Sequence, residues 1–446
     1  MSDKPATPGV YTEEMSAFPN SVVGVPTNVA AFIGYTERAE SAGKSRTGQP
    51  TQITSLYEYT QYFGGPPTPA FTLTATPNGF DITRVSGKAG GNFNLYGAMV
   101  QFFANGGGTC IIVSVGGYDA DIAADALIGV LDAMDSESAI LVIPDAVLLD
   151  ETECTRVQQA MLRCCGTTQS RFAILDLHGG DRPRTDPAGD CIESFRLQIG
   201  GEFLQFGAAY YPRLNTTAFE MTTSLQAQLD ASAKNAGLPA TRLPDLHAAA
   251  LRILNVLPPS GAMAGVYALI DNTRGVWTAP ANVSLAAVVS PSVRITADEQ
   301  TDLNTPMDGK AVNAIRSFPG QGVLVWGART LDGNSQDWRY IHVRRTLIYL
   351  EQSIQYALNV FVFAPNDSNT WINVNALISN FLTSLWQQGG LVGASAADAF
   401  SVRVGLGETM TPNDILDGYL RVAVQVALVH PAEFIVLTFQ QQMQAS

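Results

Sequence analysis

The middle of the chain alternates between short apolar runs rich in β-branched residues and amphipathic segments with apolar residues at helical spacing. The predicted strands lie at 110–115, 140–143 and 172–177, and the predicted helices at 95–104, 122–134, 151–165 and 191–199. Strands that alternate with helices of this length are typical of a mostly parallel sheet covered on both faces. The pattern predicts an α/β fold for this region.

The last third of the chain has a different pattern. A strand is predicted at 322–326, and Leu347, Leu350, Ile354 and Leu358 recur on one face of a helix over 340–359. A second helix over 370–388 ends at a Gly-Gly pair. Three further strands are predicted at 400–404, 419–429 and 434–440. In 419–429, large aliphatic residues at every second position face one way, namely Leu420, Val422, Val424, Val426 and Leu428, and Pro431 indicates a linker before the last strand.

Two segments carry turn signals instead of a core pattern. Residues 1–25 are rich in Pro, Gly and Thr, with a short extended piece at 10–14, and we interpret them as an arm. Residues 64–93 contain Asn78-Gly79 and several other glycines and prolines, which predicts an exposed hairpin or long surface loop.

Composition and charge exclude several classes of function. With 446 residues, 46% of them apolar, the chain can form two or three domains. Its 26 basic and 40 acidic residues leave a net charge of −14, which argues against nucleic-acid binding. No apolar run approaches the roughly 20 residues of a membrane span, and the N-terminus lacks the apolar core of a signal peptide. We therefore expect synthesis in the cytoplasm and no direct insertion into membranes.

The sequence signals for metal and cofactor sites are weak. Gly106–Gly108 follows a predicted helix and precedes a strand, the reverse of a phosphate loop, so it indicates a helix end. Cys164, Cys165, His178 and Cys191 lack the paired spacing of structural zinc ligands. Reduced, buried thiols are the favoured interpretation, and we expect no metal, disulfide or cofactor.

Two acidic residues stand where α/β enzymes place catalytic or metal-binding carboxylates. Asp145 and Asp176 follow predicted parallel strands. The alternative is that acidic residues are common in such loops and cap the next helix along the chain. Because no nucleophile or base motif accompanies them, we favour the capping role.

Several sequence blocks, in order and spanning nearly the whole chain, resemble the tail sheath proteins of contractile phages and related injection particles. Each block alone is weak, but the ordered set is specific. They are PGVYTEE and GVPTNVAAFIGYTERA near the N-terminus, FFANGGGTCIIV, RFAILDLHG and PPSGAMAGVYALIDNTRGVWTAPAN in the middle, and RSFPGQGVLVWGART, WRYIHVRRTLIYLEQSI, GETMTPNDI and PAEFIVLTFQQ in the last third.

This resemblance implies a multidomain α/β subunit. We expect an N-terminal arm at 1–25, an inserted outer α/β domain with a subtilisin-like parallel sheet at 26–300, which includes the exposed loop at 64–93, and a C-terminal sheath core domain at 301–446. The mixed sheet of the core domain would be completed by strands exchanged between subunits, with 434–440 as a donated terminal strand.

The resemblance also implies the function. The chain would form a helical sheath around an inner tube and contract to drive that tube through a target membrane. Its partners would be further copies of itself or paralogous sheath subunits, the inner tube protein, and baseplate and tail-terminator proteins, in a phage-tail-like particle. The match looks closest to injection particles, with a true phage tail as the alternative. A subtilisin-like hydrolase is disfavoured because alanine stands at position 262, where the nucleophile would be in Ser260–Ala264.

Strand exchange gives the candidate site residues, which are Val10, Tyr11 and Thr12 of the arm and Phe434, Ile435, Val436, Leu437 and Phe439 of the terminal strand. The alternative, left open here, is that 434–440 pairs with 419–429 of the same subunit. Arg344 and Arg345 are expected on the solvated surface, with an interface role toward the tube or a neighbouring subunit as the second possibility.

Overall fold

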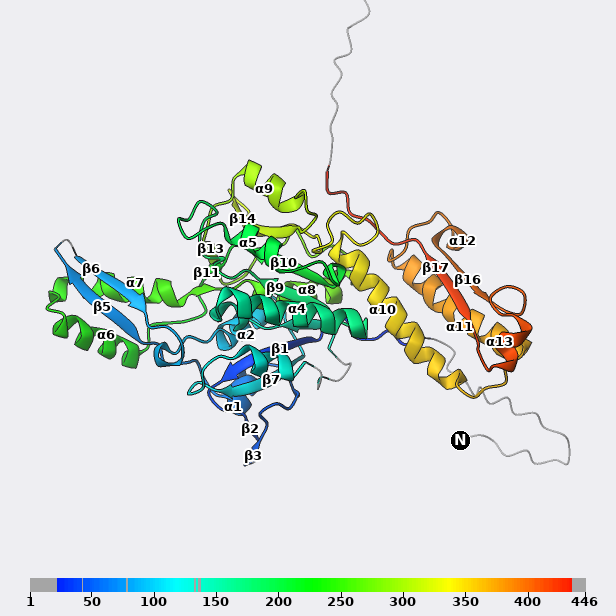
Figure 1. Cartoon of the computed structure of the whole chain (residues 1–446), viewed down its shortest axis with the longest axis horizontal. Helices are drawn as coiled ribbons and strands as arrows, with labels where there is room; N and C mark the ends of the chain where they lie inside the picture. The colour runs from blue at the N-terminus through cyan, green and yellow to red at the C-terminus, as the bar shows by residue number, and fades with distance from the viewer. Residues whose placement is uncertain (1–21, 42, 78, 132–133, 135–137, 435–446) are drawn as a thin grey trace, which may run out of the picture. The chain divides into compact units, whose positions relative to one another are not determined.

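The structure is a computed structural model that describes residues 22–434, except 42, 78, 132–133 and 135–137 (Figure 1). It divides into two compact units, each described separately below. The small unit comprises the described residues of Met1–Val25 together with Leu350–Val429. The large unit comprises Pro26–Tyr349 and the described residues of His430–Ser446.

A mixed sheet of eight strands, counted over the described residues, forms the centre of the large unit. Its order is β15 (Gly322–Trp326), β14 (Val312–Phe318), β10 (Gly207–Tyr211), β9 (Phe172–Asp176), β8 (Ile140–Val142), β1 (Ala30–Thr36), β7 (Cys110–Gly117) and β4 (Thr51–Ile53). The six inner strands are parallel, and the two edge strands, β15 and β4, run antiparallel to their neighbours. The predicted mostly parallel α/β sheet is therefore confirmed.

The central strand β1 shows why the sheet is covered on both faces. All seven of its residues are buried, and they alternate between two separate apolar clusters. Ala31, Ile33 and Tyr35 pack with helices α3 (Ala124–Gly129), α4 (Glu151–Thr168) and α5 (Cys191–Gln198). Ala30 and Phe32 pack with α1 (Leu56–Phe63), α2 (Leu95–Ala104) and α8 (Ser260–Arg274) on the other face. Because successive side chains of a strand point to opposite faces of the sheet, this one strand contributes to two cores.

The periodic elements of the sequence appear close to their predicted bounds. Helices α2, α4 and α5 and strands β7, β8 and β9 all form where expected, and α2 ends before the three glycines. Helix α3 is shorter than predicted. It covers Ala124–Gly129, whereas the prediction was 122–134. Helix α8 was not predicted. Ten of its residues are buried, so it lacks the polar face that a helical pattern requires.

Contrary to the prediction, the two strand-end aspartates do not cap the helices that follow them along the chain. They hold the N-termini of the buried helices α2 and α8, which pack against each other. Asp145 accepts the N–H of Asn94, at the start of α2, at 2.6 Å and the N–H of Tyr35 at 2.9 Å. Asp176 accepts the N–H of Ser260, the first residue of α8, at 2.8 Å and also bonds to the Ser260 hydroxyl. Both side chains satisfy helix donors that would otherwise be buried without partners.

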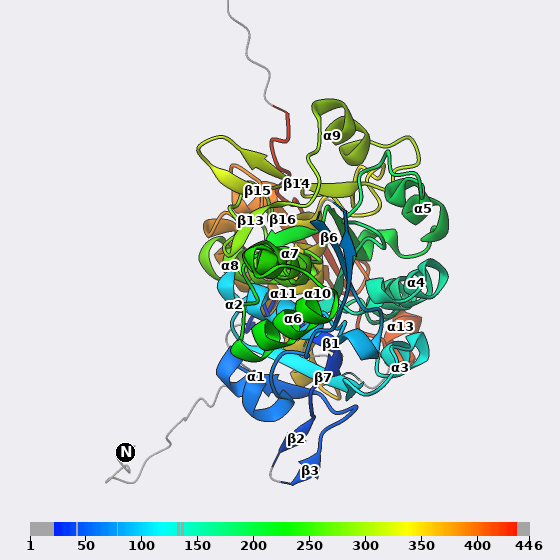
Figure 2. The same cartoon turned by 90° about the vertical axis from the view of Figure 1, so that its left-hand side faces the viewer.

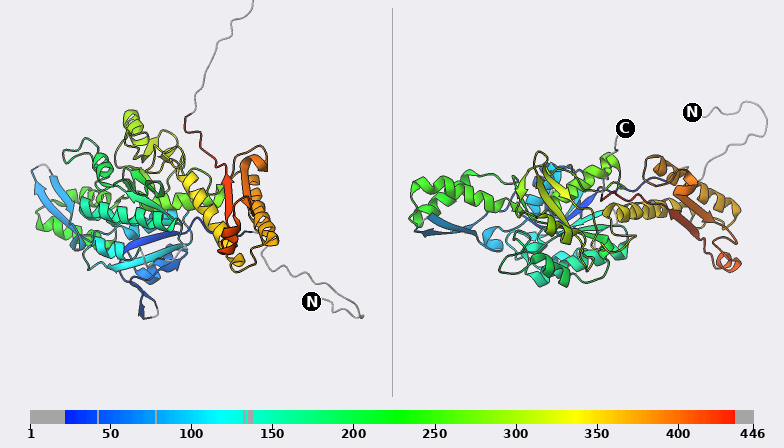
Figure 3. Two further views of the ribbon diagram at one scale, coloured as in Figure 1. Left: turned by 45° about the vertical axis from the view of Figure 1, so that its right-hand side comes forward. Right: turned by 90° about the horizontal axis from the view of Figure 1, so that it is seen from above.

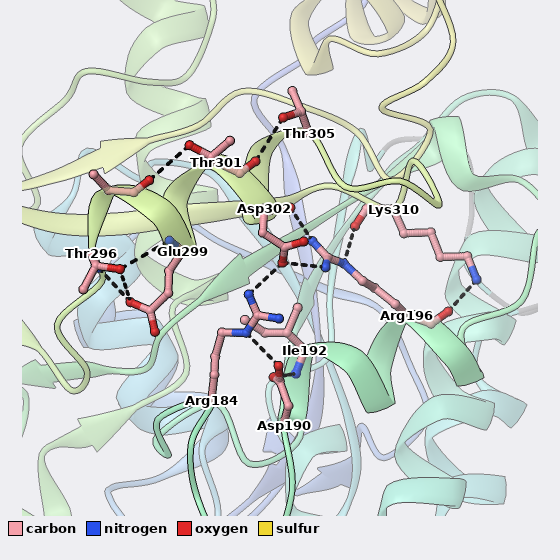
Figure 4. Close-up of polar contacts among 11 residues, drawn as sticks. Arg184, Asp190, Ile192, Arg196, Thr296, Glu299, Thr301, Asp302, Thr305 and Lys310 are labelled. Carbon is pink, nitrogen blue, oxygen red and sulfur yellow. Dashed lines mark hydrogen bonds and ion pairs between the residues drawn. The ribbon is translucent and has the colours of Figure 1, made fainter.

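A network of ion pairs ties α5 to α9 (Ala297–Asn304) within the large unit (Figure 4). The Asp302 carboxylate accepts from Arg184 at 2.6 Å and from Arg196 at 2.9 Å, and Arg184 also contacts Asp190. Partial burial opposes ionisation of Asp302, but the two guanidinium groups outweigh it and lower the pKa of this carboxyl. A capping box of Thr296 and Glu299 fixes the start of α9.

The segment at 64–93 contains a hairpin, which is one of the two predicted possibilities for it. Strands β5 (Phe71–Thr76) and β6 (Gly79–Arg84) lie beside α6 (Thr223–Asn235) and α7 (Leu243–Leu254) (Figures 1 and 2). The apolar face of the hairpin packs on a third cluster from the two helices, while Thr72, Thr74 and Thr83 are exposed. Removing the hairpin would therefore expose this cluster.

The small unit contains two long helices and a two-stranded sheet (Figure 3). Its elements are the C-terminal part of α10 (Ile341–Leu358), α11 (Ser368–Gln387), α12 (Ala396–Ala399), β16 (Phe400–Val404), α13 (Pro412–Leu416) and β17 (Val422–Val426). The two predicted helices and the strand at 400–404 are confirmed, and β17 occupies the middle of the predicted strand at 419–429. The boundary between compact units falls after Tyr349, whereas the predicted functional domains meet at 300/301.

Replacing each of the two capping aspartates by asparagine should lower the free energy of unfolding by different amounts. In Asp145 both carboxylate oxygens face backbone N–H groups, so Asp145→Asn leaves one donor without an acceptor and should lower the free energy of unfolding by about 1–3 kcal/mol. In Asp176→Asn the Ser260 hydroxyl can rotate to accept from the amide, so the loss should be small. Denaturant titration of both variants at neutral pH checks the contrast, and equal losses would contradict it.

The same variants test how the stability of the fold depends on pH. Burial raises the pKa of Asp145 to about 6 and that of Asp176 to about 7, although their hydrogen bonds act in the opposite direction. A carboxyl with a raised folded-state pKa contributes stability that is complete below the unfolded pKa of about 3.9 and is lost as pH rises through the folded value. Asp176→Asn should therefore flatten the part of the stability profile between about pH 4 and pH 7.

Candidate functional site

The two-stranded sheet of the small unit has one open edge. The strands are antiparallel, with Phe400 opposite Val426, and the Ala427 N–H donates to the Ala399 carbonyl at 2.8 Å. Hydrogen-bonded residue pairs recur at every second position of such a ladder. The backbone N–H and C=O groups of Ala423 and Gln425 therefore also point to β16. The N–H and C=O groups of Val422, Val424 and Val426 consequently point to the opposite edge.

No group among the described residues hydrogen-bonds to that edge of β17. The outer edge of β16 differs, because the Asn375 side chain of α11 donates to the Val402 carbonyl at 2.9 Å. An unpaired edge with valines on one face is a template for an added strand, which would supply the missing main-chain hydrogen bonds.

A separate candidate feature is a carboxylate anchor in the large unit, formed around Glu433. The Arg329 guanidinium donates to both oxygens of Glu433, at 3.0 and 2.6 Å. The Asn304 amide donates at 2.7 Å and the Tyr340 hydroxyl at 3.0 Å. Partial burial opposes ionisation of Glu433, but the Arg329 and Asn304 hydrogen bonds outweigh it and lower the pKa. Four donors on one carboxylate hold the backbone firmly at this residue.

The anchor lies next to the predicted donated strand. Phe434, the following residue, exposes 71% of its surface, so the chain leaves the anchor with its first aromatic side chain in solvent. The other strand residues, Ile435, Val436, Leu437 and Phe439, lie outside the described residues, as do Val10, Tyr11 and Thr12 of the arm. Their exchange between subunits stays a prediction.

Arg344 and Arg345 do not lie on the surface. They expose only 5% and 4% of their area. Arg345 forms a bidentate ion pair with Asp271, at 2.9 and 2.6 Å, and the Arg344 guanidinium lies 4.3 Å from the centroid of the Phe206 ring. Both have partners within the large unit, so the expectation of solvated arginines is wrong, and an interface role is not needed to explain them.

Sequence reasoning missed the anchor as a site, whereas 419–429 is the core strand that was expected to accept exchanged strands. The partners of Glu433 lie 129, 104 and 93 positions away along the chain, so no local motif joins them. One signal was available, because Glu433 is the only acidic residue after Asp417 and directly precedes an apolar run.

Substituting the anchor carboxylate should destabilise the large unit. Glu433→Gln removes the charge opposite Arg329, whose side chain is 5% exposed, and should cost about 2 kcal/mol in the free energy of unfolding. Denaturant titration measures the loss. Glu202→Gln, at an exposed position of the same unit, is the control and should change little. Equal free energies of unfolding for both variants would show that the anchor does not stabilise the large unit.

Comparisons with known proteins match the architecture and the sequence. Residues 334–442 match the family model of the phage tail sheath C-terminal domain. The tail sheath protein of Vibrio phage KVP40 is 26% identical over 184 residues, which is 41% of this chain and 26% of that protein. The tail sheath protein of Burkholderia phage BcepMu is 28% identical over 144 residues, 31% of this chain and 30% of that protein. The chain thus spans less than a third of the length of these curated relatives.

Solved structures match over almost the full length. The sheath complex of the extracellular contractile injection system PVC, in its contracted state, is 30% identical with a TM-score of 0.69, covering 99% of both chains. The helical sheath of the anti-feeding prophage (AFP), also contracted, is 33% identical with a TM-score of 0.68, covering 98% of this chain and 100% of that one. A chain of the AFP baseplate structure is 32% identical with a TM-score of 0.67.

Proposed function

This chain belongs to the family of contractile sheath proteins, and on that premise we propose that it polymerises as a helical sheath around an inner tube and contracts to drive the tube through a target membrane. Contraction requires two packings of the same subunit that differ in free energy, with the assembly held in the higher one. Assembly itself then stores the energy, and neither a nucleotide nor a metal takes part.

The proposed partners follow from the same family. They are further copies of the chain or paralogous sheath subunits, an inner tube protein, and baseplate and tail-terminator proteins. The full-length similarity to structures of injection systems favours an extracellular phage-tail-like particle over a phage tail. Among the described residues, no helix is long and apolar enough to cross a bilayer. We assign membrane passage to the tube and not to this chain.

A structural role also suits the residues that first suggested catalysis. Asp145 and Asp176 are buried and used as helix caps. Ser260, which begins the stretch compared with a hydrolase nucleophile turn, is fully buried and bonded to Asp176. A substrate has no access to these groups in the folded subunit, which supports a protein without catalytic activity.

Subunits in this account are linked by exchanged strands. The arm residues Val10–Thr12 and the terminal residues Phe434–Phe439 each join the core sheet β16–β17 of a neighbour, which lies within the predicted core domain at 301–446. The observation that carries this proposal is the unpaired edge of β17. Main-chain hydrogen bonds made there survive large movements of the subunits, because the linkers bend and the ladder does not.

A proline on the open edge should separate folding from assembly. The Val424 N–H faces away from β16, so Val424→Pro leaves the β16–β17 ladder intact but removes a donor that an added strand needs. We expect a folded, soluble subunit by circular dichroism that no longer forms tubes in negative-stain images. Gln425→Pro, at a position bonded to β16, should instead disturb the fold of the small unit.

Truncation after Glu433 is the companion variant. It removes the terminal segment and retains the anchor, so the subunit should fold and stay soluble without forming tubes. Tubes from either the truncated chain or Val424→Pro would refute strand exchange, and unfolding of the truncated chain would indicate that 434–446 belongs to the subunit's own core.

A further inference from the structure

The large unit holds the chain at one residue, here called a root, beside each of the two terminal segments. The root of the arm is Thr27, whose carbonyl accepts from Nη2 of Arg345 at 2.9 Å. The root of the terminal segment is Glu433, with the donors described above. The Asn28 amide also donates to Asn272 at 2.8 Å, but this contact is exposed, so water competes with it. Arg345 is therefore the stronger of these two holds on the arm.

The guanidinium of Arg345 is fixed by the residues around it. It forms the bidentate ion pair with Asp271, whose side chain is 2% exposed, and lies 4.7 Å from the centroid of the Tyr267 ring. Asp271 and Tyr267 lie one turn apart on α8, and the Tyr267 hydroxyl bonds to that of Tyr210 on β10 at 2.8 Å. Helix α8 and the sheet thus direct the remaining N–H of Nη2 at Thr27.

Stability alone does not explain this arrangement. Burying an ion pair requires desolvation of both charges, and apolar residues of similar volume often stabilise a core as well or better. Apolar residues do not supply a charged donor directed at a main-chain carbonyl. The buried Arg345–Asp271 pair supplies such a donor at the root of the arm. We therefore assign the pair a role in positioning the chain.

Neighbouring residues hold the two roots. Tyr340 donates to Glu433 at 3.0 Å, and Arg345 lies near the start of α10, which begins at Ile341. Four helical steps separate Ile341 from Arg345, which is about 6 Å along the helix axis. The start of the helix is itself fixed, because the Ile341 N–H donates to the Ala328 carbonyl at 3.0 Å. Both roots are thus attached to one short, rigid element.

We propose that residues 340–345 hold the roots of both exchanged strands at a fixed separation, and that Arg345 is the positioning residue for the arm. This inference rests on the strand exchange proposed above and adds which part of each connection bends. Bending is confined to the residues before Thr27 and after Glu433. A neighbour that pulls on one strand therefore moves the large unit and the other strand together, without slack.

Releasing the arm root should lengthen its linker by a defined amount. The next main-chain bonds described along the chain join the Val29 carbonyl to the N–H groups of Ala139 and Ile140, at 2.9 and 3.2 Å. Loss of the bond to Thr27 therefore frees Thr27 and Asn28, which is about 7 Å of extended chain. Slack of this length would let the spacing between neighbouring subunits vary.

A spin label tests the hold on the arm in the full-length subunit before assembly. Pro26 is exposed, adjoins Thr27 and has no N–H to lose, so a nitroxide on Pro26→Cys reports the mobility of the root. The half-buried Cys164 is replaced by serine in this background. Arg345→Lys keeps a charge opposite Asp271 but not the planar set of donors, and should raise the mobile fraction of the electron paramagnetic resonance spectrum about twofold. Unchanged mobility overturns the proposal.

Arg196→Lys is the matched control. Arg196 is also buried, pairs with Asp302 at 2.9 Å and donates to the Lys310 carbonyl at 3.1 Å, but its bonds go to neither root. This variant should lower the free energy of unfolding, as Arg345→Lys does, and leave the mobility of the label unchanged. Equal gains in mobility from both arginine variants would indicate a general loosening of the unit and would overturn the positioning role.

Electron microscopy of assembled tubes tests the consequence for the sheath. The distribution of spacings between neighbouring subunits should widen about twofold in Arg345→Lys and in Glu433→Gln, which loosens the other root, because each variant adds slack. Arg196→Lys should keep the wild-type width. If Arg345→Lys does not fold, Glu433→Gln alone decides this test. Wild-type spacing in Glu433→Gln, or a mobile label with unchanged spacing in Arg345→Lys, overturns the fixed separation. Absence of tubes from the wild-type chain would instead refute the proposed function, and the spin label would still decide whether Arg345 holds the arm.

Discussion

Backbone N–H and C=O groups at a sheet edge must bond to water or to another strand, and this requirement governs the small unit. A sheet of two strands is marginal by itself, because each strand bonds on one side only. In β17 the groups of three valine residues face outward without partners among the described residues, and the neighbouring edge of β16 is partly satisfied by Asn375. In the strand exchange that we propose, an extended segment from another subunit would complete the ladder and cover the edge at once. Assembly and completion of the fold would then be the same event.

The large unit has the opposite character. Its sheet is covered on both faces, its strand-end aspartates satisfy the N-termini of two buried helices, and ion pairs around Asp302 fix α9 to α5. Close-packed cores of this kind do not deform continuously. Such a unit is suited to move as a rigid body while flexible connections accommodate the change in packing. The Glu433 anchor ties the root of the terminal segment to this rigid unit.

The sequence predicts the buried strands from their short apolar runs and the amphipathic helices from their spacing, and it fails for a helix that lacks a polar face. Helices α2, α4 and α11 were found from their spacing, and so was the alternation in β17. Helix α8 was missed because it is buried on nearly all sides. The turn residues of β5–β6 predict a hairpin, but not the packing of its apolar face, because that face depends on helices about 150 positions later in the sequence.

The candidate site shows the same limit. The arm and the terminal strand could be named from their composition and from the family resemblance, but the state of the β17 edge depends on how β16 and Asn375 lie. Arg345 was expected in solvent because its partner, Asp271, lies 74 positions away along the chain. Buried ion pairs between distant residues leave no local signature.

Cryo-electron microscopy of tubes assembled from the full chain tests the central claim most directly. Strand exchange predicts continuous density for an added strand on the edge of β17 that is connected to a different subunit. An edge that remains bare in the tube, or one covered by a segment of the same subunit, would contradict it.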